Sequence, residues 1–380
     1  MADKEIVPNS FTFCQDSIWR KILAIKNSKK VGSAYIFSGP KGSGKEGIAI
    51  KFAQLLNCEA NTKDLCKACP SCIRCDKLEH ENIKFVFPLP TSSKNTRDNL
   101  SLISTKDAEY VKSAFLKKSK NLFHKIKVPK ANKILLRSVR QLKKFLYLTT
   151  YSNGRKVVIV FDSHLMSTGQ AETANAFLKL LEEPPAKTTF VLVTDYPDHL
   201  LATIVSRCQK INFPKLSDSY IRSWLIEERV DSKSLNLFMA ISRGNMQSAK
   251  FFVEHNERDI IKLISDLVSK TTKINPVNWR SFIDQYSRIA KQDKTKFVNH
   301  FMMLKVWLLS ANLLKKRIDH PLQNTSLKTN MEKFISEYPS SDISKFIVEL
   351  EQAEHSIGLN LNMPLVLVNM LINIQEILKN

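Results

Sequence analysis

Gly39-Pro40-Lys41-Gly42-Ser43-Gly44-Lys45 is the most informative segment of this 380-residue chain. It follows a short apolar run, Ala34 to Phe37, that predicts a buried strand, and it precedes a stretch from Gly47 to Leu56 with helical periodicity. A glycine-rich turn between a strand and a helix lets backbone N–H groups converge on phosphate oxygens, while a lysine neutralises the outer phosphates. The residues expected to contact phosphate are Gly39, Gly42, Gly44 and Lys45.

Further along the chain, three more apolar runs alternate with helical stretches: Ile83 to Leu89, Lys156 to Asp162, and Thr189 to Thr194. Nearly continuous apolar strands that alternate with helices predict an α/β domain with a parallel sheet covered on both faces. Strand signals vanish beyond Pro214, and only helical periodicity remains. We therefore predict three parts, an α/β domain over residues 1–213 followed by helical domains over 214–270 and 271–380.

Two positions near the loop lack the usual chemistry of nucleotide hydrolysis. Glu46 stands directly after Lys45, where a Ser or Thr hydroxyl would bind Mg²⁺. The third apolar run ends in Asp162, which could reach Mg²⁺, but Ser163 follows where hydrolysing proteins carry a second acid. These departures indicate poor or absent hydrolysis, and they leave open whether ATP and Mg²⁺ bind at all.

Five of the seven cysteines fall within residues 58–75. In a chain without an export signal, such clustering favours a metal over disulfides. Spacings of seven, two and two residues predict a structural Zn²⁺ site in a module over residues 58–80, with a tetrahedral shell of Cys58, Cys66, Cys69 and Cys72. The pattern leaves open whether Cys75 or His80 replaces one ligand. An iron–sulfur cluster is less favoured, because the common ferredoxin spacing is absent.

The charge is strongly positive, with 58 Lys and Arg against 36 Asp and Glu. The segment 91–156 holds 17 basic and 3 acidic residues, which suits either contact with nucleic-acid phosphates or a solvated surface insertion. No apolar run approaches the roughly 20 residues of a membrane span, the longest being Met363 to Ile374. The first residues lack a signal-peptide pattern. We expect a cytoplasmic protein with no membrane partner.

Two later segments complete a recognisable set: Ala174-Asn175-Ala176-Phe177-Leu178-Lys179-Leu180-Leu181-Glu182-Glu183-Pro184-Pro185 and Ser206-Arg207-Cys208. A strand, a phosphate loop, a four-cysteine insertion and these segments, in this order, resemble bacterial clamp-loader subunits. These are AAA+ ATPase-fold proteins of the DNA polymerase III holoenzyme, and the resemblance covers about residues 10–250. It implies an AAA+ domain with an inserted zinc module, a helical lid over 214–270 and an all-α collar domain over 271–380 that oligomerises.

Two branches of this family compete, the gamma/tau motor that hydrolyses ATP and the delta-prime stator that does not. Motor subunits carry a hydroxyl residue, an acid and a sensing arginine where this chain has Glu46, Ser163 and Gln247. The resemblance therefore favours delta-prime. The alternatives are an active gamma/tau motor and, in a different class, a zinc-containing nucleic-acid-binding module outside replication.

The resemblance also implies site residues and partners. Arg207 corresponds to an arginine finger that enters the ATP site of a neighbouring motor subunit, where a guanidinium stabilises charge on the transferred phosphate. Thr194 corresponds to a sensor near the γ-phosphate. The implied partners are gamma/tau and delta subunits in a hetero-pentamer, the sliding clamp, and primed DNA contacted through its backbone without sequence specificity. The implied location is the nucleoid-associated replisome of a bacterial cytoplasm.

Overall fold

The computed structural model describes residues 11–28, 30–60, 62–91, 104–147, 154–167, 171–320, 322, 324–358 and 361–379. The described residues form two compact units. The first extends to Ser217 and also includes Gly244–Gln247, and the second contains Asp218–Arg243 and the residues from Ser248 onward. A further division of the helical part at residue 270 stays a prediction.

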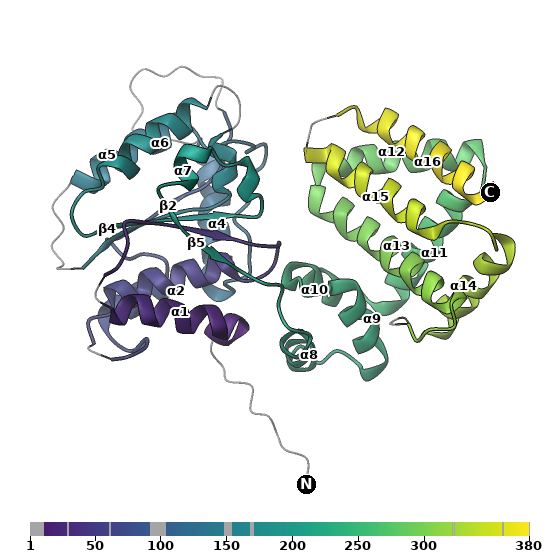
Figure 1. The fold of residues 1–380 in the computed structure, drawn as a ribbon, viewed down its shortest axis with the longest axis horizontal. Coiled ribbons are helices and arrows are strands. Elements are labelled where there is room, and N and C mark those ends of the chain that lie inside the picture. The colour runs from purple at the N-terminus through teal and green to yellow at the C-terminus, as the bar shows by residue number, and fades with distance from the viewer. Residues whose placement is uncertain are drawn as a thin grey trace, which may run out of the picture. The chain divides into compact units, whose positions relative to one another are not determined.

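The first unit is built on a parallel sheet (Figure 1), with the strand order β2-β3-β4-β1-β5 in the described part of the chain. The strands are β1 (Ala34–Ser38), β2 (Ile83–Val86), β3 (Lys156–Val160), β4 (Thr188–Thr194) and β5 (Gln209–Asn212). β1 lies between β4 and β5, and its last residue, Ser38, aligns with Thr194 and Asn212. The loops that follow β1, β3 and β4 therefore meet at one edge of the sheet.

Alternate side chains of β1 explain why helices cover both faces. Tyr35 and Phe37 pack against Phe52 of α2 (Lys45–Asn57), with ring centroids 5.4 and 6.1 Å apart. Ile36 instead belongs to a buried cluster with residues of α5 (Leu136–Tyr147) and α6 (Glu172–Glu182), including Phe177. Figure 1 shows α2 and this helix pair on opposite faces. The predicted parallel sheet with two covered faces is confirmed.

Further helices and one unpredicted strand complete this unit. β5 was not expected, because only Ile211 of its four residues is buried and the sequence shows no apolar run there. The remaining helices are α1 (Asp16–Asn27), α3 (Pro70–Asp76), α4 (Thr105–Lys120) and α7 (Ala202–Val205), with 3-10 turns at Phe11–Gln15, Ser163–Met166 and Pro197–His199.

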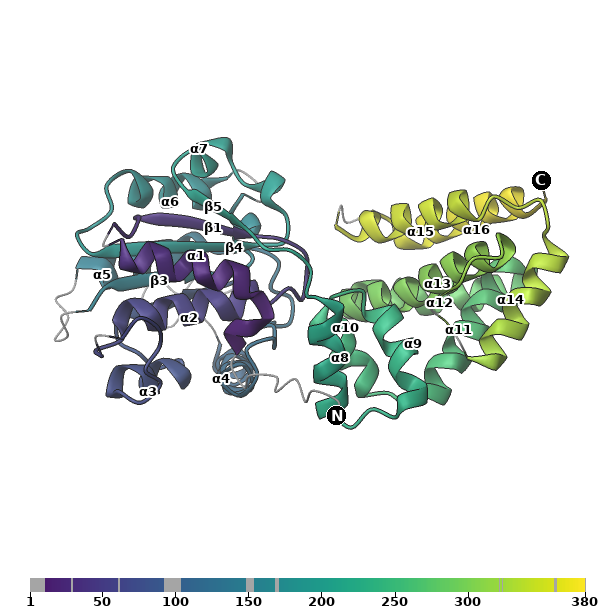
Figure 2. The ribbon, with the colours of Figure 1, turned by 60° about the horizontal axis from the view of Figure 1, so that its bottom comes forward.

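The described part of the second unit is helical. Its helices are α8 (Asp218–Glu227), α9 (Ser232–Ser242), α10 (Met246–Val253, of which Met246 and Gln247 belong to the first unit), α11 (Glu257–Thr272), α12 (Pro276–Gln292), α13 (Lys294–Lys315), α14 (Thr325–Glu337), α15 (Ile343–Gly358) and α16 (Met363–Lys379). The last two lie side by side (Figure 2).

The long helix α13 forms the centre of the helical unit. Trp307 is fully buried there and contacts Phe334 of α14, with ring centroids 5.3 Å apart. By length and composition α13 could cross a membrane, which makes it a better candidate than the Met363–Ile374 run noted in the sequence. However, 67% of its most apolar 18-residue window is buried inside the protein, as in the core helix of a globular unit.

Candidate functional site

The glycine-rich loop has the expected shape of a phosphate-binding loop. It leaves β1 and enters α2, and Gly42 and Gly44 adopt positive φ angles of 70° and 85°. A side chain at Gly42 would collide with the amide oxygen of Asn245, and one at Gly39 would collide with the backbone oxygen of Phe213. These positions require glycine both for backbone conformation and for the close approach of neighbouring segments.

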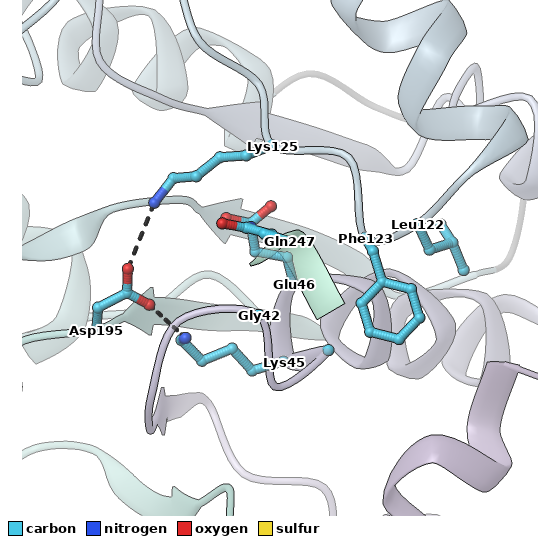
Figure 3. A pocket seen from close by; sticks show the side chains of 9 residues that line it. Gly42, Lys45, Glu46, Leu122, Phe123, Lys125, Asp195 and Gln247 are labelled. Atoms are coloured by element: carbon cyan, nitrogen blue, oxygen red, sulfur yellow. Dashed lines mark hydrogen bonds and ion pairs between the residues drawn. The ribbon is translucent and has the colours of Figure 1, made fainter. Parts of the chain in front are cut away.

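Lys45, the loop lysine, is engaged within its own chain. Its ammonium donates to the carbonyl oxygen of Pro40 at 2.9 Å and forms an ion pair with Asp195 (Figure 3). Burial alone would raise the pKa of Asp195, but Lys125 and Lys45 outweigh it and hold that pKa well below its usual range. Asp195 was missed in the sequence, although its place directly after β4, the strand beside β1, is a signal that could have found it.

A second lysine joins the acids that follow β3 and β4. Nζ of Lys125 lies 2.6 Å from Oδ1 of Asp162 and 3.5 Å from Oδ2 of Asp195. Burial lowers the pKa of Lys125, but these two carboxylates more than compensate and raise it well above its ordinary value. Asp162, the residue expected to reach Mg²⁺, is therefore paired with a cation from the same chain.

A third lysine, Lys118, forms an ion pair with the carboxylate of Glu46. Nζ of Lys118, at the end of α4, lies 2.5 Å from Oε2 of Glu46. It also donates to the carbonyl oxygens of His124 at 2.7 Å and Leu122 at 3.2 Å. The side chain of Lys118 is 0% exposed, and burial lowers its pKa despite the attraction of Glu46. The position that should offer a hydroxyl to Mg²⁺ is thus part of a buried ion pair.

Thr194, the expected sensor, lies at the end of β4 and is fully engaged. Its hydroxyl oxygen accepts from the backbone N–H of Tyr196 at 2.9 Å and lies 3.1 Å from Nδ1 of His164. Burial lowers the pKa of His164 to about 4, so its imidazole is neutral near pH 7. Ser163 is buried, and its hydroxyl has no hydrogen-bond partner among the residues that the structure describes. Neither residue replaces the missing acid as a base for hydrolysis.

The cavity at the loop is too small for a nucleotide. Its volume is about 20 Å³, enough for roughly one water molecule. Gln247, which stands where motor subunits carry a sensing arginine, lines this cavity without a charge (Figure 3). Magnesium with a triphosphate therefore does not fit the arrangement of residues. The lining residues are Gly42, Gly44, Lys45, Glu46, Leu122, Phe123, Lys125, Asp195 and Gln247.

Arg207 lies just after α7 and does not line this cavity. Its side chain is 39% exposed, and its Nη2 lies 2.9 Å from Oε1 of Glu182 at the end of α6. Its Nη1 donates to the carbonyl oxygen of Thr203 at 3.0 Å. The pair with Glu182 brings together the two segments, 174–185 and 206–208, that carried the resemblance in the sequence.

The four predicted zinc ligands are gathered around α3. The sulfur atoms of Cys58, Cys66, Cys69 and Cys72 all lie within 4.8 Å of one another. The backbone N–H of Cys69 donates to Sγ of Cys66 at 3.4 Å, and the backbone donors of Cys69 and Ala68 lower the pKa of Cys66 to about 6. Four convergent sulfur donors with N–H support fit a tetrahedral zinc site.

The two alternative ligands lie outside this group. Cys75 is buried, and burial raises the pKa of its thiol to about 12. Both ring nitrogens of His80 are engaged elsewhere. Nε2 lies 2.8 Å from the hydroxyl oxygen of Ser71, and Nδ1 accepts from the backbone N–H of Asn82 at 3.1 Å. The geometry therefore favours the original set of four cysteines.

The basic segment 91–156 contributes to the candidate site in a way that the sequence did not indicate. Residues 92–103 and 148–153 lie outside the described residues. In the remainder, Lys118 and Lys125 point inward and pair with the acids around the loop. For these two lysines, neither of the two interpretations from the sequence, contact with DNA or a solvated surface, is correct. Other lysines of α4, including Lys112 and Lys117, are exposed.

The strand order and the glycine-rich loop together define an AAA+ P-loop domain. Residues 14–217 match the profile of the family described as DNA polymerase III, delta subunit. The chain belongs to this family of clamp-loader proteins.

Among its relatives, DNA polymerase III subunit tau of Bacillus subtilis is 27% identical over 255 residues, which cover 67% of this chain and 37% of the relative. Subunit delta' of the same organism is 29% identical over 201 residues, which cover 53% and 48%. The chain thus spans between a third and a half of the length of these relatives. A solved gamma subunit-related protein of Thermotoga maritima is 18% identical, with a TM-score of 0.42 and coverage of 95% of this chain and 98% of that one.

Proposed function

We propose that this chain is a delta-prime-type stator of a bacterial replicative clamp loader, a subunit that does not hydrolyse ATP itself. The observation that carries the proposal is the pairing inside the phosphate-loop site, where Lys45 is bound to Asp195 and Glu46 to Lys118. The absence of an acid at Ser163 supports the same role. Such a subunit contributes structure to the assembly rather than chemistry at its own loop.

Its chemical contribution would be Arg207, supplied in trans to the ATP site of a neighbouring motor subunit. The exposure of Arg207 and its position away from the loop of its own chain support this role. The partners of the proposed stator are gamma/tau and delta subunits, with the sliding clamp and the backbone of primed DNA as the substrates of the assembly. Its location would be the replisome in the bacterial cytoplasm.

Two structural roles belong to the same proposal. Zn²⁺ would be held by Cys58, Cys66, Cys69 and Cys72 and would fix the loop between α2 and α3, without an open position for catalysis. The helices of 214–270 would form the lid, and those of 271–380 would form the collar that joins the subunits.

The motor subunit remains a second candidate, because the alignment with tau covers more of this chain than the alignment with delta' does. ATPase assays of the isolated chain, and of its complex with motor and delta subunits, clamp and primed DNA, separate the two. We expect an inactive isolated chain, an active complex, and a large loss of the complex's activity with Arg207→Ala. Hydrolysis by the isolated chain that Lys45→Ala abolishes would establish the motor instead.

A further inference from the structure

The strongest unexplained feature is the convergence of three ammonium groups and three carboxylates at the phosphate loop. Lys45, Lys118 and Lys125 face Glu46, Asp162 and Asp195, so the group has no net formal charge. In a P-loop site that binds Mg–nucleotide, the lysine is free to meet phosphates, and the metal ion supplies the charge that the acids require. Here every acid of the group already has a cation of the same chain.

Lys125 stands where the metal would be. A Mg²⁺ ion bound to Asp162 would lie about 2.1 Å from a carboxylate oxygen. The Lys125 ammonium lies 2.6 Å from that residue's Oδ1 and also faces Asp195. The ion and the ammonium would compete for one place and repel each other, so only one of them can be present.

Lys118 anchors the segment that carries Lys125. Besides its ion pair with Glu46, it donates to the carbonyl oxygens of Leu122 and His124, the residues that lead into Lys125. Its ammonium also lies 5.1 Å from the ring centroid of Phe161, next to Asp162. Burying an ammonium is costly unless it is paired and hydrogen-bonded. The many partners of Lys118 therefore indicate that its buried position is a specific feature of the fold.

The same segment is packed against the glycines at the start of α2. A Cβ atom on Gly44 would lie 3.2 Å from the ring of Phe123, and one on Gly47 would lie 2.9 Å from Cβ of Leu122. Phe123 in turn packs against Phe11 in a tilted arrangement, with ring centroids 4.6 Å apart. Entry of a triphosphate would therefore require the whole segment 122–125 to leave, together with its lysine.

We propose that Lys125 is a built-in replacement for Mg²⁺, and that the segment 118–125 permanently closes the phosphate loop against nucleotide. This inference rests on the proposed non-hydrolysing role and gives a physical cause for it. That cause can be tested with the isolated chain. The inference also predicts a latent property: without the Lys125 ammonium, Asp162 loses its cation, and Asp195 keeps only its ion pair with Lys45, so the two carboxylates have an excess negative charge that suits a divalent cation.

The test compares the full-length wild-type chain with Lys125→Met and with Lys117→Met, an exposed α4 variant with the same change of charge. Binding of Mn²⁺ is read from the electron paramagnetic resonance signal of the free ion, and Tm is followed with and without Mn²⁺. We expect no Mn²⁺ site at Asp162 and Asp195 in the wild type, and the same number of bound Mn²⁺ ions in Lys117→Met as in the wild type. In Lys125→Met we expect a lower Tm, one added Mn²⁺ site and recovery of several degrees when the ion is present.

Two results would overturn the inference. One is a folded Lys125→Met variant that gains no Mn²⁺ site. The other is saturable binding of the fluorescent analogue mant-ATP with Mg²⁺ by the wild-type chain, which decides the matter even if the variant does not fold. Either result could coexist with ATPase activity of the complex that depends on Arg207, so failure of this inference is distinguishable from failure of the proposed function.

Discussion

The guanidinium of Arg207 and the carboxylate of Glu182 form an ion pair at 2.9 Å that links the end of α6 to the segment after α7. Both side chains are partly exposed, at 39% and 48%. Exposed pairs of this kind contribute little to stability, so the contact orients the arginine more than it stabilises the unit. This orientation would hold the guanidinium ready for a neighbouring subunit.

We predict that Glu182→Gln changes the free energy of unfolding of the isolated chain by less than about 1 kcal/mol, because solvent screens the pair. The variant complex should keep most of its ATPase activity, since Arg207 is still present. Arg207→Lys should lose activity nearly as fully as Arg207→Ala, because an ammonium cannot reproduce the planar fork of donors. Urea denaturation and steady-state ATPase rates provide the measurements, and full activity of Arg207→Lys would refute the arginine-finger role.

Metal analysis of the purified chain should find one zinc ion per molecule. Replacing Cys72 with serine should abolish this zinc and lower Tm by several degrees, because a missing thiolate opens the tetrahedral shell. The matched control is Cys75→Ala, a nearby buried cysteine outside the group of four. It should keep the full zinc content, and loss of zinc in this control would move the ligand assignment to Cys75.

The buried pair of Lys118 and Glu46 should show strong coupling. Lys118→Met leaves the Glu46 carboxylate without its cation and should cost about 3–5 kcal/mol of unfolding free energy. The double change Lys118→Met with Glu46→Gln should cost clearly less, because it removes both charges together. Urea denaturation of the two single variants and the double variant gives the coupling energy directly. Additive effects would mean that the pair does not form.

The helical unit should become less stable as the pH falls below about 6.5. His300 is buried beside the hydroxyl of Tyr286 at 2.8 Å, and burial lowers its pKa to about 4. Because the unfolded chain takes up this proton first, stability is lost between about pH 6.5 and 4, at roughly 1.4 kcal/mol per pH unit. Between pH 7.5 and 5.5 the wild type should therefore lose about 1 kcal/mol more than His300→Gln. Equal losses in urea denaturation would contradict the pKa assignment.

The sequence predicted those parts of the fold whose signals are local. β1, β3 and β4 are continuous apolar runs, and the loop glycines lie at fixed spacing between a strand and a helix, so each could be read from neighbouring residues. β5 could not, since an edge strand with one buried residue carries almost no pattern. The four cysteines were found for the same local reason, as they fall within residues 58–72.

The ion pairs at the phosphate loop could not be predicted from the sequence. Glu46 looked like a lost magnesium ligand, and Lys118, 72 positions further on, looked like one of many lysines in a basic segment. Their ion pair depends on how α4 and the loop after it return to α2. Asp195 was more accessible, because acids that follow adjacent parallel strands must meet at one edge of the sheet.

For the proposed non-hydrolysing subunit, the pairing of Glu46 with Lys118 also limits which substitutions could produce ATPase activity. Restoring the hydroxyl residue by Glu46→Thr would not recreate a magnesium site, because Lys118 would then be a buried cation without a counterion and Lys125 would still cover Asp162. Nucleotide binding would need several simultaneous replacements, because a single replacement that leaves one of these buried charges unpaired would make the protein less stable. In the proposed stator, the stability of the fold would therefore oppose a return to catalysis.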